Sequence, residues 1–73
     1  MITGAQVQLA RRLLSWKASE LAHRAVVSVE VVALIEATAG PVRGSLGHLA
    51  AIKATLEAGG IEFTDTGGVR LLP

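Results

Sequence analysis

The chain has 73 residues, of which 51% are hydrophobic, and a formal net charge of +1 at pH 7. This length leaves room for one domain. The small net charge neither excludes nor indicates nucleic-acid binding, because phosphate contacts depend on clustered Lys and Arg rather than on the total charge. No cysteine is present, which excludes disulfides and thiolate metal sites, and no apolar run approaches the roughly 20 residues that span a membrane.

A first helix is predicted over residues 4–15. Thr3 and Gln6 have the spacing of a capping box, and Ile2 stands where a hydrophobic staple to Val7 would form. The first twelve residues lack a basic region followed by an apolar core, so we expect no signal peptide and a cytoplasmic location. The predicted buried stripe of this helix consists of Val7, Ala10, Leu13 and Leu14.

A second helix is predicted over residues 18–25, with Leu21, Ala22 and Ala25 at core spacing. Its start is weakly specified, because Lys17 stands where Ser, Thr or Asp is the preferred cap.

A third helix is predicted from residue 29 to about residue 38, capped by Ser28, with Val32 and Ile35 facing the core. Gly40 and Pro41 are expected to end it, because proline cannot continue a helix.

A fourth helix is predicted over residues 46–58, with Ser45 as its cap and the pair Gly59-Gly60 at its end. Its apolar stripe consists of Leu46, Leu49, Ile52 and Leu56.

The last residues alternate between apolar and polar side chains, which is typical of strands. A three-residue loop over 65–67, with Gly67 left-handed, would pair Phe63 with Val69, Ile61 with Leu71 and Glu62 with Arg70. An isolated hairpin is marginal in water, so this one either docks on the helices or pairs with the tail of another copy. We favour the second alternative, a homodimer, because each strand has an unpaired edge. The predicted dimerisation residues are Ile61, Phe63, Val69 and Leu71.

Two short helices joined by a tight turn, the second starting at a Ser cap, form a helix-turn-helix pattern over residues 16–36. The predicted fold class is therefore mainly α, a four-helix helix-turn-helix domain with a C-terminal β-hairpin. The pattern resembles the Xre-type, phage-repressor-like family of transcriptional regulators. The likeness is carried by Leu21-Ala22, Arg24-Ala25, Val27-Ser28, Val32, Ile35-Glu36, the opening Ile2-Thr3-Gly4-Ala5-Gln6 and the tail Gly60-Ile61-Glu62-Phe63.

The resemblance implies a homodimeric DNA-binding regulator of the bacterial cytosol or nucleoid, with its third helix in the major groove of double-stranded DNA. The implied DNA-binding residues are Lys17, Ala18, Ser28, Val29, Glu30, Ala33, Leu34 and Arg43. The family's base readers correspond to Ala18, Val29, Glu30, Ala33 and Leu34. Of these only Glu30 can read a base edge by a hydrogen bond, from cytosine N4, while Val29, Ala33 and Leu34 can touch thymine methyl groups. Lys17 and Arg43 are the best candidates for phosphate contact, ahead of Arg11, Arg12, Arg24 and Lys53.

Two departures from the family pattern affect these expectations. Val26 occupies a turn position where the family prefers glycine, and a β-branched residue tolerates a left-handed backbone badly. The third helix is apolar where polar base readers are common. If its residues Val29, Ala33, Leu34 and Ala37 are buried, they widen the core. If they are exposed, they form a patch suited to a protein partner, and the alternative function is a protein-interaction module such as an antirepressor.

Catalysis finds little support in the sequence, and we expect no enzyme activity and no cofactor. Asp65 is the only aspartate and falls in a predicted turn. His23 and His48 lie on different predicted helices, without a cluster of ligand-spaced side chains beside them.

Overall fold

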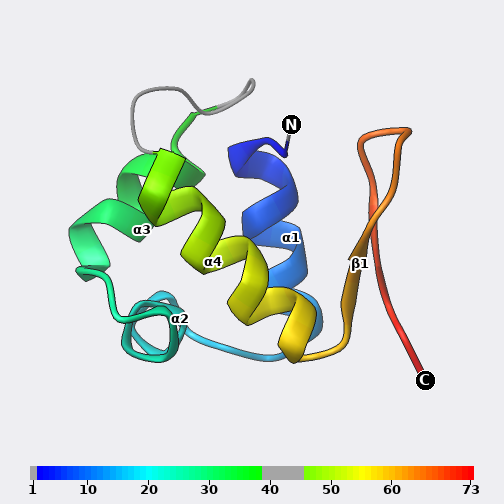
Figure 1. Ribbon diagram of the computed structural model, residues 1–73, viewed down its shortest axis with the longest axis horizontal. Helices are drawn as coiled ribbons and strands as arrows, with labels where there is room; N and C mark the ends of the chain where they lie inside the picture. Colours follow the sequence, from blue (N-terminus) through cyan, green and yellow to red (C-terminus); the bar gives the residue numbers. More distant parts are fainter. Residues whose placement is uncertain (1, 39–45) are drawn as a thin grey trace.

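The computed structural model describes residues 2–38 and 46–73 (Figure 1). The helices are α1 (Gly4–Leu13), α2 (Ala18–Ala25), α3 (Val29–Glu36) and α4 (Leu46–Ala58), and the strands are β1 (Ile61–Phe63) and β2 (Val69–Leu71). The predicted mainly α fold class with a C-terminal hairpin is confirmed. The expected helix stop at Gly40 and Pro41, the cap at Ser45, the phosphate contact at Arg43 and the side chain of Leu46 lie outside the described residues.

The start of α1 forms as its sequence predicts. The Gln6 amide donates to Thr3 Oγ1 (3.1 Å), and the Thr3 amide donates to Gln6 Oε1 (2.8 Å), which completes the capping box. Ile2 and Val7 are both buried, in agreement with a hydrophobic staple. A Cβ atom on Gly4 would collide with backbone carbonyl oxygens at the end of α3, so glycine is what allows α1 to approach α3 this closely.

The end of α1 differs from the prediction by two residues, because Ser15 adopts a left-handed backbone with φ 59°. The Trp16 amide then reaches back to the Arg11 carbonyl (3.1 Å), as in a Schellman cap. Leu13 was predicted in the buried stripe, but its side chain is 40% exposed. Its spacing is helical, but the rest of the protein does not fully cover it.

The turn between α2 and α3 carries the strain that its sequence suggests. Helix α2 has the predicted bounds, and Val26 follows it with φ 57° and ψ 48°, a left-handed conformation. The Val27 amide donates to the Ala22 carbonyl (3.0 Å), which closes the turn. Val26 is 88% exposed, so no burial of its side chain compensates for the strain.

Helix α3 begins at Val29, as predicted, with the Val31 amide donating to Ser28 Oγ (3.2 Å). It ends at Glu36, two residues earlier than expected. Val32 and Ile35 are buried, as their spacing predicts. The core that collects these side chains consists of Ile2, Val7, Ala10, Leu21, Ala22, Ala25, Val32, Ile35, Leu49, Ile52, Leu56 and Ile61.

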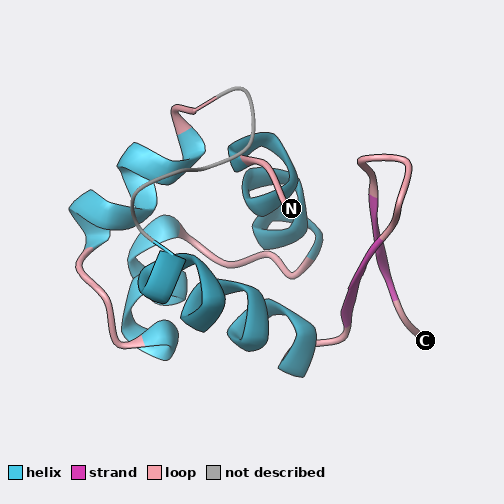
Figure 2. Ribbon diagram, turned by 45° about the horizontal axis from the view of Figure 1, so that its top comes forward, coloured by secondary structure: helices cyan, strands magenta, loops and turns pink. Residues whose placement is uncertain are grey.

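The hairpin has the predicted register, with Ile61 opposite Leu71, Glu62 opposite Arg70 and Phe63 opposite Val69. Gly67 is left-handed with φ +84°, and Arg70 binds Glu62 across the strands. The hairpin lies beside the helical body (Figure 2), where β2 contacts α1 and β1 contacts α4.

Docking on the helices, one of the two predicted alternatives for the hairpin, is therefore present within a single chain. Gln6 Nε2 donates to the Gly68 carbonyl (3.1 Å) and ties the hairpin to α1. The predicted role of Ile61 in dimerisation needs correction, because its side chain is buried in the core of its own chain. Phe63 and Val69 also pack against this core, and only Leu71 of the four predicted dimerisation residues is exposed. None of the described helices has the length and apolar character needed to cross a membrane.

The strain at Val26 gives a stability test. We expect Val26→Gly to stabilise the protein by about 1 kcal/mol, since relief of about 1–3 kcal/mol of left-handed strain exceeds the entropic cost of glycine. Thermal unfolding followed by circular dichroism should show Tm rising by roughly 4–8 °C. The matched control is Val27→Gly, which removes a side chain packed against the core and should lower Tm. An unchanged or lower Tm for Val26→Gly would show that this turn is not strained.

Candidate nucleic-acid interface

Helix α3 is held to the body of the protein by an ion pair with α1. Arg11 Nε donates to Glu36 Oε2 (2.7 Å), and Arg11 Nη2 donates to Glu36 Oε1 (2.9 Å). Arg11 Nη1 also donates to the carbonyl of Trp16 (3.0 Å), just before α2. The two side chains are only 14% and 9% exposed, so the pair is largely desolvated. One guanidinium thus joins α1, α3 and the segment that leads into α2.

The electrostatics of this pair favour the charged guanidinium. The hydrogen bonds to Glu36 raise the pKa of Arg11 above its ordinary value, against the opposing effect of burial. Stabilisation from a raised pKa is complete below the ordinary value and is lost only as pH rises through the pKa of the folded state. Arg11 therefore contributes fully at neutral pH. The predicted phosphate contact by Arg11 is not supported, because its donors are used inside the fold.

The outward face of α3 contains the side chains that were predicted to meet DNA. Val29, Glu30, Ala33 and Leu34 are all exposed, and Leu34 is 66% exposed. Ala37, one turn beyond Ala33, is exposed as well. Of the two interpretations left open by the sequence, burial in a widened core is thus wrong, and α3 has an exposed apolar face with one carboxylate.

The beginning of α2 is open to solvent. Lys17 is the N-cap residue and is exposed, and no side chain caps the first amides of the helix. Ala18, in contrast, is half-buried and packs against the core, so its predicted contact with DNA would involve little of its side chain. A positive side chain and free amides at a helix start are together suited to a phosphate group.

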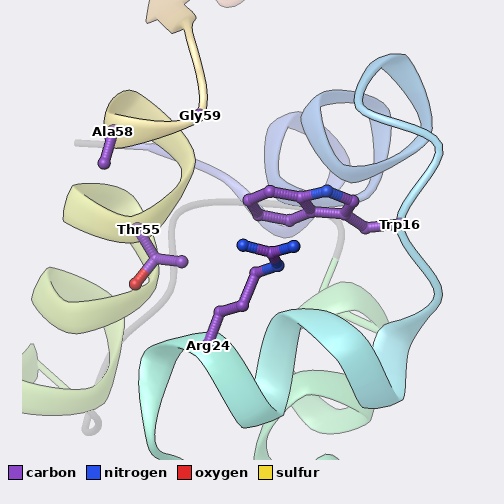
Figure 3. A pocket seen from close by; sticks show the side chains of 5 residues that line it. All are labelled: Trp16, Arg24, Thr55, Ala58 and Gly59. Atoms are coloured by element: carbon purple, nitrogen blue, oxygen red, sulfur yellow. The ribbon is translucent and has the colours of Figure 1, made fainter.

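The Arg24 side chain is engaged in contacts within the protein and is not free to bind phosphate (Figure 3). Its guanidinium lies 4.5 Å from the centre of the Trp16 ring. It also donates twice to Glu20 Oε2, from Nε at 3.0 Å and from Nη2 at 2.8 Å. Trp16 in turn packs near Gly59 at the end of α4, where a Cβ atom would lie 3.1 Å from the indole. Arg24 therefore links α2 to Trp16 and α4.

The other cationic side chains that were predicted to contact phosphate are more accessible than Arg11 and Arg24. Arg12, Lys17 and Lys53 are exposed, and none of them takes part in an ion pair within residues 2–38 and 46–73. Lys53 lines a depression formed by the hairpin loop and the start of α1, on the opposite flank of α1 from α3. Lys17 is consequently the described cation that best fits a phosphate contact near the helix-turn-helix.

His23 and His48 are exposed and line a shallow groove beside Val26. Among the side chains that the structure describes, no three His, Cys, Asp or Glu residues are grouped to hold a metal ion. The chain matches no protein-family model and no curated protein.

Two interactions of this region were not predicted from the sequence. The pairing of Arg11 with Glu36 joins residues 25 positions apart, and the contact of Arg24 with Trp16 crosses from a loop to a helix. A signal for the first was present, because Arg11 borders the apolar stripe of α1 and a charge at such a border usually finds a partner.

The ion pair gives a second test. We expect Glu36→Gln to destabilise the protein by about 2–3 kcal/mol, because it leaves a largely buried guanidinium without its counter-charge. Urea unfolding with an unchanged m value would measure this loss. The matched control, Glu20→Gln, disrupts the exposed pair with Arg24 and should cost no more than about 0.5 kcal/mol. Equal effects of the two substitutions would contradict the role of Arg11 as the connection between α1 and α3.

Proposed function

We propose that this protein is a DNA-binding transcriptional regulator of the Xre type, which inserts α3 into the major groove of double-stranded DNA. The observation that carries the proposal is the exposure of the whole outward face of α3, from Val29 to Ala37, on a helix anchored from behind by Arg11. A helix that enters a groove must be uncovered on one side and rigidly held on the other. The resemblance of residues 16–36 to this family agrees with that use.

Contacts with the phosphate backbone would supply most of the affinity. Lys17 and the uncapped amides of α2 offer one positively polarised point of attachment. Arg43 offers a second attachment in the segment between α3 and α4. Such contacts orient a protein on the duplex without reading its sequence, and binding that depends on them weakens as salt concentration rises.

Base reading by α3 would be sparse. Glu30 can accept a hydrogen bond from cytosine N4, and Val29 and Leu34 can contact thymine methyl groups. Glu30 also repels phosphates, so its position near the start of α3 favours sites where a cytosine amino group compensates for that repulsion. Specificity would then depend largely on the shape and deformability of the DNA.

A test of this function compares two lysines. We expect Lys17→Ala to weaken binding to all duplexes alike and to reduce the slope of log K against log salt by about 1, since one phosphate contact is lost. Fluorescence anisotropy over a salt series measures both quantities. Lys53→Ala removes an equal charge near the hairpin and should change neither by a comparable amount. The absence of salt-dependent binding to any duplex would reject the proposal.

The exposed apolar face favours a second candidate function, a protein-interaction module such as an antirepressor. Val26 and Leu34 are 88% and 66% exposed, and Val29 lies close to both in the sequence. An apolar surface of this kind is suited to a partner helix or groove, whereas DNA-reading surfaces usually contain Arg, Asn or Gln.

One substitution distinguishes the two functions. We expect Leu34→Lys to preserve the fold, because the side chain is mostly in solvent. If α3 binds DNA, the added positive charge should strengthen binding to duplexes in general by about 1 kcal/mol or less. If α3 binds a protein through its apolar face, the same change should weaken the complex. Anisotropy with mixed-sequence duplex, with circular dichroism as a check of folding, separates the two results.

A further inference from the structure

A small pocket lies where the start of α1, the middle of α4 and the hairpin loop meet. The start of α1 and the hairpin loop reach the same end of the molecule (Figure 1). The lining of this pocket includes Ile2, Thr3, Gln6, Lys53, Phe63 and Asp65. Its volume is about 300 Å³. Small-molecule sites usually measure about 300–1,000 Å³, so this one is suited to a small ligand. We call it the hairpin pocket.

Some polar side chains of the hairpin pocket already bond within the protein. Gln6 is buried, and its side-chain amide bonds to the Thr3 amide and to the Gly68 carbonyl. Thr64 Oγ1 accepts from the Gly68 amide (2.9 Å) and lies 3.0 Å from Thr66 Oγ1. These contacts connect α1 to the hairpin and close the hairpin loop. Gln6 and Thr64 therefore shape the wall of the pocket and have little hydrogen-bonding capacity left for a ligand.

Lys53 and Asp65 are the charged side chains of the hairpin pocket. One lies on α4 and the other in the hairpin loop, and both are exposed. Within residues 2–38 and 46–73 neither takes part in an ion pair, so the two do not bind each other. Opposite charges that border one pocket without meeting can each bind the complementary charge of a ligand.

Apolar side chains complete the wall of the hairpin pocket. Ile2 is buried and Phe63 packs against the core, and both also line the pocket. An apolar wall together with two opposite charges favours a ligand that has an apolar group and no net charge. Such a ligand gains from burial of its apolar group and satisfies Lys53 and Asp65 together.

We propose that the hairpin pocket binds a free α-amino acid with an apolar side chain. The carboxylate of the amino acid pairs with the Lys53 ammonium, and its own ammonium group pairs with the Asp65 carboxylate. Its side chain lies against Phe63 and Ile2. A zwitterion binds better than a ligand with a single charge, because an anion would lie near Asp65 and a cation near Lys53 without compensation. The volume of the pocket suits one amino acid rather than a peptide or a nucleotide.

This site is independent of the proposed function, because none of the residues that line it is among those proposed to contact DNA.

The first experiment compares three molecules that share one carbon skeleton. L-Leucine carries both charges, isocaproate lacks the ammonium group and isoamylamine lacks the carboxylate. Each is titrated into the isotope-labelled whole chain and followed by heteronuclear NMR. L-Leucine should shift the amide signals of residues 2–6, 53 and 63–67, with a dissociation constant of about 1 mM or below. Each analogue should bind at least about tenfold more weakly, because it leaves one charge of the pocket unpaired.

Free glycine tests the apolar wall in the same titration. It keeps both charges but has no side chain to lie against Phe63, so it should also bind at least about tenfold more weakly than L-leucine.

The second experiment changes the pocket. Lys53→Gln and Asp65→Asn each remove one charge with little change of shape, and each should raise the dissociation constant of L-leucine at least about tenfold. The matched controls are Arg12→Gln and Glu57→Gln, which remove exposed charges outside the pocket and should stay within about threefold of the wild type. Circular dichroism shows whether each variant is folded.

Two results would overturn the inference. One is the absence of shifts in these amide signals with L-leucine, L-valine and L-methionine at about 10 mM, a concentration that would fill a millimolar site. The other is isocaproate or isoamylamine binding as tightly as L-leucine, which would show that the pocket does not recognise paired charges. Anisotropy with duplex DNA in the absence of amino acid tests the contacts of α3 alone, so the failure of either proposal leaves the other standing.

Discussion

The bidentate ion pair between Arg11 and Glu36 connects parts of the fold that local interactions leave separate. Helix capping and turn geometry determine α1, α2 and α3 individually, but they do not determine how α3 sits against α1. Arg11 does so with three donors, two to Glu36 and one to the Trp16 carbonyl. A planar guanidinium suits this task, because its donors form a rigid fork that an ammonium group lacks.

Two arginines of this region are engaged inside the fold and are therefore not available to a ligand. Arg11 and Arg24 both belong to the structure, the first through Glu36 and the second through Glu20 and Trp16. The positive charge left for a polyanion is correspondingly small, and in the described residues near the helix-turn-helix it is concentrated at Lys17. For the proposed binding to DNA, a chain with this charge distribution would need attachment at several points.

The outward face of α3 exposes Val29 and Leu34 to water with Glu30 as its one charged side chain. Such a face offers shape and apolar contact but few directional hydrogen bonds, which is why two candidate functions, in DNA binding and in protein binding, are proposed for it.

Local sequence determined most of this protein's secondary structure. The capping box at Thr3, the Ser28 cap and the hairpin register were all predictable, because each depends on residues within about ten positions of one another. Tertiary packing decided what periodicity does not specify. It exposed Leu13, buried Ile61 and withdrew Arg11 from the surface. Helical spacing shows which side chains share a face, but only the arrangement of neighbouring elements determines whether that face is covered.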